Sequence, residues 1–133
     1  VFCWNLATRP LAEPMNLTSA PAPADVDEFD IATGLSAIPG TVVDAPRVRE
    51  SPVNFECRVT QIVDLVGHDG ALAGSSVVFG EVVMVHIDRR VLGPDGYDAI
   101  AAAPILRWGG GGDYLEVRQA AVFKMRRPGW PLE

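Results

Sequence analysis

The side chains in this sequence that could do chemistry are few and far apart. His86 ends an apolar stretch, and a histidine near neutral pH can donate to a ligand or act as an acid. A bond from its ring to a backbone carbonyl is the alternative that we favour. Residues 109–112 are four consecutive glycines, whose backbone N–H groups could approach an anion closely. The run matches neither a dinucleotide-binding turn nor a phosphate-binding P-loop, so a flexible loop is an equal alternative.

For the other residues of reactive type, the sequence indicates structural roles. Glu81 interrupts an apolar stretch, so we expect it to be buried and paired, and Arg58 on the facing strand is the candidate partner. Cys57 alternates with apolar residues, which predicts a small core side chain and not a reactive thiol. Ser75 and Ser76 lack the strand–turn–helix sequence of a nucleophile elbow. We therefore assign no catalytic residue.

Composition excludes several classes of site and partner. Cys3 and Cys57 form no disulfide framework, and His68 and His86 have no cysteine near them, so we predict no metal site. The net charge of −6 argues against nucleic acid or an anionic membrane as a partner. No apolar run reaches the roughly 20 residues of a transmembrane helix. Cysteine usage suggests a reduced, cytoplasmic domain.

The strongest structural pattern covers residues 52–88. Apolar and polar residues alternate from 53 to 65, which predicts a half-buried strand, and the break at Gln61 and Ile62 indicates a bulge. Residues 77–88 are apolar on both faces, as in a strand covered on both sides inside a closed barrel or at a dimer interface. Together these segments predict a long antiparallel hairpin with an irregular loop.

The remaining elements are short. Proline and glycine divide the chain so often that no long helix fits, and the whole sequence, residues 1–133, reads as one mainly β domain, a barrel or an α+β fold. We expect strands at 1–6, 114–117 and 120–125, helices at 7–17, 25–32 and 97–103, and an irregular segment at 35–51. Asp25 is the expected N-cap of the second helix.

Several stretches, in order, resemble the flavin reductase-like family with the FMN-binding split-barrel fold. Each resembles a short family motif, and together they cover roughly the first 117 residues. They are Phe2-Cys-Trp-Asn-Leu, Met15-Asn-Leu-Thr-Ser, Val26-Asp-Glu-Phe with Thr33-Gly-Leu, Glu50-Ser-Pro-Val-Asn-Phe-Glu-Cys, Gly80-Glu-Val-Val-Met-Val-His-Ile-Asp, and Arg107-Trp-Gly-Gly with Tyr114.

The resemblance implies a function. It implies a homodimer of split barrels that binds FMN non-covalently near the subunit interface and acts as an NADH- or NADPH-dependent flavin reductase. A flavin-dependent monooxygenase is an implied partner that would receive the reduced flavin. Two alternatives stay open: a split-barrel protein that binds flavin or another ligand without turnover, and a truncated chain without ligand that keeps a dimer interface.

The resemblance also assigns candidate cofactor-binding residues. They are Asn5, His86, Arg107, Gly109, Gly110 and Tyr114. The family's opening strands supply much of the FMN contact and are expected before Val1, so the sequence is predicted to be the C-terminal two-thirds of the split barrel, incomplete at its N-terminus. Cys3-Trp4 stands where the family has a pair of small aliphatic residues.

Overall fold

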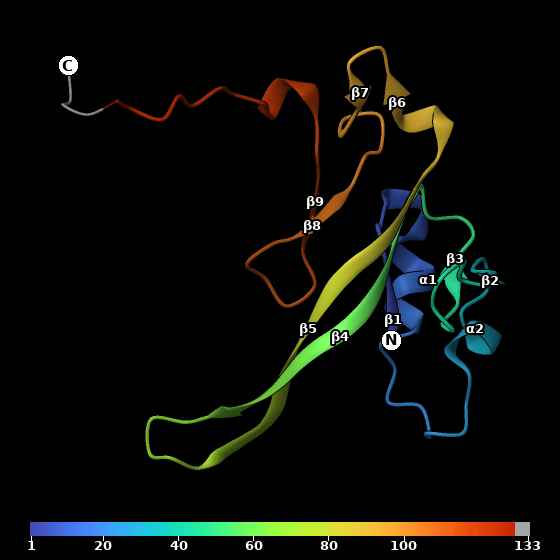
Figure 1. Ribbon diagram of the computed structural model, residues 1–133, viewed down its shortest axis with the longest axis vertical. Helices are drawn as coiled ribbons and strands as arrows, with labels where there is room; N and C mark the ends of the chain where they lie inside the picture. Colours follow the sequence, from blue (N-terminus) through green and yellow to red (C-terminus); the bar gives the residue numbers. More distant parts are fainter. Residues whose placement is uncertain (130–133) are drawn as a thin grey trace.

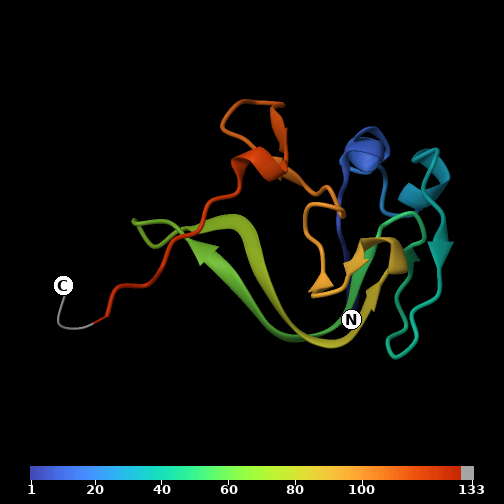
Figure 2. The same cartoon turned by 90° about the horizontal axis from the view of Figure 1, so that it is seen from above.

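The computed structural model of the chain, which describes residues 1–129, is built on one three-stranded antiparallel sheet. The strand order is β1 (Phe2–Asn5), β4 (Val53–Val66) and β5 (Leu72–Ile87), with β4 in the centre. The two long strands form a hairpin whose closed end extends away from the other elements (Figure 1). Seen from above, the hairpin curves into an open arc (Figure 2).

The hairpin confirms the main sequence prediction. Its pairing shifts register between Val59 and Gln61, next to the predicted bulge, and again between Glu56 and Cys57 and at the end of β4. Each extra residue increases the local twist of a strand pair, which is consistent with the curvature of the hairpin. In the connecting turn, Gly70 has a φ of +83°, a conformation that glycine adopts without strain.

The helices are shorter than predicted and lie near β1. A 3-10 turn at Arg9–Leu11 leads into α1 (Ala12–Leu17), and α2 covers Glu28–Ile31. The predicted cap at Asp25 is wrong, because the Asp27 carboxylate accepts the Phe29 N–H at 2.9 Å and the helix begins only afterwards. Both helices gather with β2 and β3 at the end of the sheet away from the hairpin turn (Figure 1).

Small strand pairs complete the fold. They are β2 (Ala37–Ile38) with β3 (Arg47–Val48), β6 (Leu92–Gly93) with β7 (Gly96–Tyr97), and β8 (Ile105–Arg107) with β9 (Tyr114–Glu116). Further 3-10 turns lie at Arg89–Val91 and Gln119–Ala121. The segment 35–51 is thus more regular than predicted, and the last predicted strand, 120–125, is absent.

The predicted helix at 97–103 is also absent. The Asp98 carboxylate accepts the backbone N–H groups of Ile100 and Ala101, at 2.9 and 3.0 Å, and so closes a single turn. Ala103 then takes a positive φ of 47°, which ends any helical path. The alanine-rich composition favours helix, but this local side-chain bonding prevails.

The sheet buries polar groups at one end and exposes apolar groups at the other. Val53, Cys57, Asn54 and Glu56 at the start of β4 are all buried, whereas most of the hairpin beyond them is exposed. The described residues therefore do not cover the apolar faces of β5, contrary to a barrel closed by this chain alone. Glu81 is exposed and forms no ion pair within residues 1–129, so its predicted burial and pairing with Arg58 are wrong.

Candidate functional site

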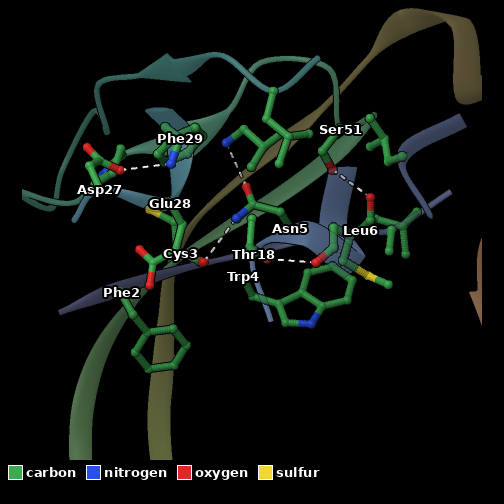
Figure 3. Close-up of a pocket in the computed structure, with 16 residues that line it drawn as sticks. Phe2, Cys3, Trp4, Asn5, Leu6, Thr18, Asp27, Glu28, Phe29 and Ser51 are labelled. Atoms are coloured by element: carbon green, nitrogen blue, oxygen red, sulfur yellow. Dashed lines mark hydrogen bonds between the residues drawn. The ribbon is translucent and has the colours of Figure 1, made fainter. Parts of the chain in front are cut away.

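A groove of about 660 Å³ runs along β1 (Figure 3). Its volume lies in the usual range for a small-molecule site. The walls come from β1, α1, the start of α2 and the segment around β3. Most of the lining side chains are apolar, and they include Phe2, Trp4, Leu6, Leu11, Met15, Phe29, Leu35, Pro46 and Val48, with Cys3, Asn5, Thr18, Asp27, Glu28 and Ser51 among the polar ones.

Trp4 supplies the largest aromatic surface in the groove. Its ring stacks on Phe55 of β4 with centroids 4.8 Å apart and an angle of 29° between the planes. Of the Trp4 residue surface, 43% remains exposed. An aromatic ring held on one face and open on the other suits a flat aromatic ligand, because stacking and apolar contact both add to affinity.

Asn5, one of the predicted cofactor-binding residues, lines this groove. Its side-chain oxygen accepts the Val48 N–H at 3.0 Å and the Asn54 side-chain N–H at 2.8 Å. Its side-chain nitrogen donates to the Cys3 carbonyl at 3.1 Å (Figure 3). The amide therefore ties β1 to β3 and β4, and its main role in this structure is to fix the groove wall.

His86, the second predicted residue, meets a buried carboxylate behind the groove. Its Nε2 lies 2.5 Å from Oε1 of Glu56, whose exposed fraction is 0%. Burial acts to raise the pKa of Glu56, but the backbone N–H groups of residues 41–43 and the His86 ring outweigh it and lower the pKa from 4.5 to about 2. Glu56 is therefore an anion at neutral pH.

Arg47 connects the two predicted residues. Its Nε lies 3.8 Å from Glu56 Oε1, and its guanidinium donates to Asn54 Oδ1 at 3.4 Å. Asn54 in turn bonds Asn5. Asn5 and His86 thus belong to one polar network, which runs across the sheet where β1, β4 and β5 pair.

The other four predicted residues lie elsewhere, in the β8–β9 hairpin. The Arg107 guanidinium lies 5.0 Å from the centroid of the Tyr114 ring and donates to the Gly111 carbonyl at 2.8 Å. Gly109 and Gly110 belong to the loop between these strands. Tyr114 lines a separate cleft of about 650 Å³. A single site built from all six residues therefore stays a prediction.

In that second cleft, the two cations among the described lining residues are paired. Arg9 and Arg118 line it, and both pair with the carboxylate of Glu116, at 3.5 and 3.0 Å. Each guanidinium is largely exposed, so these ion pairs contribute little to stability. The aromatic side chain of this lining is Tyr114, and the Arg107 guanidinium lies over its ring. We therefore regard the groove along β1, where 43% of the Trp4 surface is exposed, as the candidate site.

Sequence reasoning missed the centre of the polar network. Asn54, Glu56 and Arg47 are all part of it, but the alternating pattern had placed Asn54 and Glu56 on the solvent face of β4. The register of β1 on β4, which places Asn5 opposite Asn54 and Cys3 opposite Glu56, would have located them, but the alternating pattern does not give that register.

The cysteines are free, and no metal site is present within residues 1–129. Cys57 is 3% exposed, which confirms its predicted core position. Burial, and then the nearby Glu56 carboxylate, raise the pKa of the Cys3 thiol, which keeps this thiol protonated. No group of three histidine, cysteine or acidic side chains could hold a metal ion in the described part of the chain. No described helix is long and apolar enough to cross a membrane.

Two curated relatives resemble the chain in sequence. It is 30% identical to an uncharacterized protein of Halalkalibacterium halodurans over 118 residues, which is 87% of this chain and 53% of the relative. It is also 30% identical to an uncharacterized protein of Aquifex aeolicus over 91 residues, 68% of this chain and 42% of that protein. The chain therefore spans about half the length of these relatives.

Solved structures share the fold at lower identity. Nitrilotriacetate monooxygenase component B from Bacillus cereus superposes with a TM-score of 0.81 at 23% identity, over 92% of this chain and 58% of its own. A split-barrel-domain protein from Shewanella frigidimarina has a TM-score of 0.73 at 24% identity, over 93% of this chain and 60% of its own. Flavoredoxin of Desulfovibrio vulgaris has a TM-score of 0.72 at 22% identity, over 93% of this chain and 61% of its own. The fold is thus that of the split barrels, of which this chain covers about three fifths.

The family profile of the flavin reductase like domain matches residues 1–108. The matched region contains the whole groove, the network of Glu56 and the long hairpin. The fold, the groove and this match agree, and the chain belongs to the flavin reductase-like domain family.

Proposed function

We propose that this chain is the flavin-binding part of an FMN-dependent oxidoreductase of the flavin reductase type, with NADH or NADPH as hydride donor. The observation that carries the proposal is the apolar groove along β1, with Trp4 on its wall, inside the region that the family profile matches. Proteins of this family typically bind flavin. The printed descriptions of the structural neighbours, a monooxygenase component and a flavoredoxin, support the same class of chemistry.

The groove fits one part of FMN and not the other. Its aromatic and aliphatic walls suit the isoalloxazine ring, which is flat and largely apolar. A phosphate needs cations or converging N–H donors. Among residues 1–129, the lining has no lysine or arginine, and it carries the carboxylates of Asp27 and Glu28. This chain therefore supplies ring contacts, and cations from outside the groove lining would have to bind the phosphate.

The residues of the groove have binding and positioning roles in the proposed reaction. Bound flavin would supply hydride transfer between a reduced nicotinamide and an acceptor. Trp4 offers a stacking surface, and apolar side chains of α1 and α2 line the same groove. Asn5 is held by three hydrogen bonds and keeps β1 at a fixed distance from β3. We assign no proton transfer to any residue of the groove.

Titration with two flavins tests this proposal. FMN and riboflavin share the ring system, and only FMN carries a phosphate. We expect saturable binding of both, followed by quenching of flavin fluorescence, with FMN binding no more tightly than riboflavin, because the described lining offers the phosphate two carboxylates and no cation. If neither flavin binds to the folded chain, the proposal is wrong, and the chain without ligand becomes the better description.

A non-catalytic flavin- or ligand-binding protein is the second candidate. The acidic groove rim favours it, because Asp27 and Glu28 would repel the phosphates of a nicotinamide dinucleotide as well as that of FMN. Oxidation of NADH or NADPH, followed at the absorbance of the reduced nicotinamide, separates the two candidates. Turnover with flavin supports the reductase, and binding without turnover supports the second candidate.

Assembly and location form part of the proposal. Exposed apolar side chains line the hairpin, which supports a homodimer that covers them: Val59, Ile62, Val63, Val77, Val78, Phe79, Val82 and Val85. Component B of a monooxygenase is a structural neighbour, so a flavin-dependent monooxygenase is the proposed protein partner. The two free cysteines support a reducing, cytoplasmic location.

A further inference from the structure

The buried carboxylate of Glu56 holds a loop that lies outside the sheet. Its Oε1 accepts the Thr41 N–H at 2.7 Å, and its Oε2 accepts the N–H groups of Val42 and Val43 at 2.7 and 2.9 Å. These three successive N–H groups form a concave anion-binding arrangement around the carboxylate. The His86 ring occupies the remaining space at Oε1. Both oxygens are thus fully used, and no ligand is needed to satisfy them.

The held loop has a fixed shape. Gly40 donates to the Ala45 carbonyl at 3.1 Å and closes the loop over Glu56. A Cβ at Gly40 would overlap the Val43 carbonyl oxygen, so only glycine allows the backbone to pass this close. The Cys3 thiol on β1 lies 3.5 Å from the Ala45 carbonyl. The loop is therefore fastened to both β1 and β4.

The chain leaves this loop directly into the groove wall. Pro46 and Val48 follow it and both line the groove. Between them Arg47 points back, toward Glu56 and the Pro39 carbonyl. The position of the wall thus depends on how the loop is held, and the loop is held mainly by one carboxylate.

A second route links the same carboxylate to Asn5. Arg47 lies beside Glu56 and bonds Asn54, and Asn54 bonds Asn5 on the groove floor. Removing the charge of Glu56 would leave Arg47 without its buried anion, and would loosen this chain of contacts as well as the loop.

We propose that Glu56 is a positioning residue for the groove: its carboxylate, which touches no ligand, holds the 40–45 loop and Arg47 so that Pro46, Val48 and Asn5 form the wall on which an aromatic ligand packs. The proposal rests on the proposed function only for the identity of that ligand.

Glu56→Gln tests the proposal, with Glu81→Gln as control. Both variants remove one glutamate charge from the paired strands β4 and β5, but Glu81 is exposed, and the carboxylate that bonds the described 40–45 loop is that of Glu56. We expect the Kd of riboflavin to rise about tenfold in E56Q, roughly the loss of one charge-assisted hydrogen bond, and to stay unchanged in E81Q. The maximal quenching at saturation should be the same in all three proteins.

A merely structural role predicts a different result. If Glu56 only stabilises the fold, E56Q should lower the fraction of protein that binds riboflavin but leave the Kd of the folded fraction unchanged. That outcome would overturn the proposal. Because E56Q loses several buried bonds, Arg47→Met serves as a second variant that leaves the loop contacts of Glu56 in place. We expect a smaller rise in Kd, about threefold, in R47M. An unchanged Kd in both variants would also contradict the proposal.

A measurement without flavin separates this proposal from the proposed function. In NMR spectra, E56Q should speed amide hydrogen exchange of residues 41–43 at least about tenfold and shift the side-chain amide signals of Asn5. E81Q should change neither. If wild type binds no flavin but these changes occur, the proposed function fails and the positioning role stands. If the side-chain amide signals of Asn5 are unchanged in E56Q, the positioning role is wrong, whether or not flavin binds.

Discussion

Acid should destabilise the chain through Glu56, in a pH range that the structure defines. The pKa of this carboxyl is about 2 in the folded protein and 4.5 for an ordinary glutamate. Because the folded pKa is the lower one, the stability that the carboxylate contributes is present above pH 4.5 and is lost as the pH falls toward 2. Glu56→Gln removes this titration and should flatten the dependence of stability on pH in that range.

The size of the effect follows from the two pKa values. At pH 3.25 an ordinary glutamate with a pKa of 4.5 is about 95% protonated, and one with a pKa of 2 is about 5% protonated. Unfolding therefore takes up about 0.9 proton at Glu56 at this pH. Asp88 also has a pKa lowered to about 2, by its hydrogen bonds with Arg90, but it is present in wild type and variant and cancels in their difference.

Urea unfolding followed by circular dichroism measures this difference. Free energies of unfolding are determined for wild type and E56Q between pH 2.5 and 7, and the slope of their difference against pH gives the number of protons. We expect about 0.9 proton at pH 3.25 and none above pH 6. A difference below about 0.2 proton at pH 3.25 would show that Glu56 is not ionised and bonded as described.

Three further predictions concern the sheet and the groove. Gly80→Val should destabilise the fold by about 1–3 kcal/mol in urea unfolding, because a Cβ there would lie 2.7 Å from the Phe2 ring. Trp4→Phe should abolish most of the quenching of protein fluorescence by riboflavin, whereas Trp108→Phe should retain it, since Trp4 lines the groove and Trp108 does not. Phe79→Glu should halve the mass measured by light scattering, because it places a charge on the exposed apolar hairpin, where Phe79 is 50% exposed.

Each of these has an outcome that would contradict it. Gly111→Ala is the control for Gly80, because a Cβ there has open space around it, and equal loss of stability in both variants would refute the steric explanation. Unchanged quenching in W4F would place the flavin outside the groove. An unchanged mass for a folded F79E variant would show that the hairpin is not the dimer contact.

The hairpin could be predicted from the sequence because its pattern is local. Two apolar-rich segments joined by a glycine turn leave few other pairings, and Gln61 marked the bulge within one residue. The small strands β2 and β3 could not be predicted, since two-residue strands have no period and depend on the loop held by Glu56. Short segments take their structure from such tertiary contacts.

The candidate site was predicted only in part, and the error concerns burial. Glu81 looked buried because its neighbours are apolar, whereas Glu56 looked exposed because it alternates with them. The structure reverses both, since the residues that surround Glu56 come from a loop more than ten positions away in sequence. The helix cap was predicted two residues too early, because Asp25 followed by Glu28 matches the spacing of a capping box, whereas the helix is capped by Asp27.

The way the hairpin pairs has a consequence for the order of folding. β4 and β5 meet across the short turn at 67–71, so they lose little chain entropy when they form, whereas β1 must find β4 across a long loop, since Phe2 pairs with Cys57. We expect the hairpin to form first and β1 to dock last, when Glu56 captures the loop at 41–43. Until then the exposed apolar side chains of the β4–β5 hairpin are the surface most prone to aggregation. The yield of folded protein on refolding should therefore fall as the protein concentration rises.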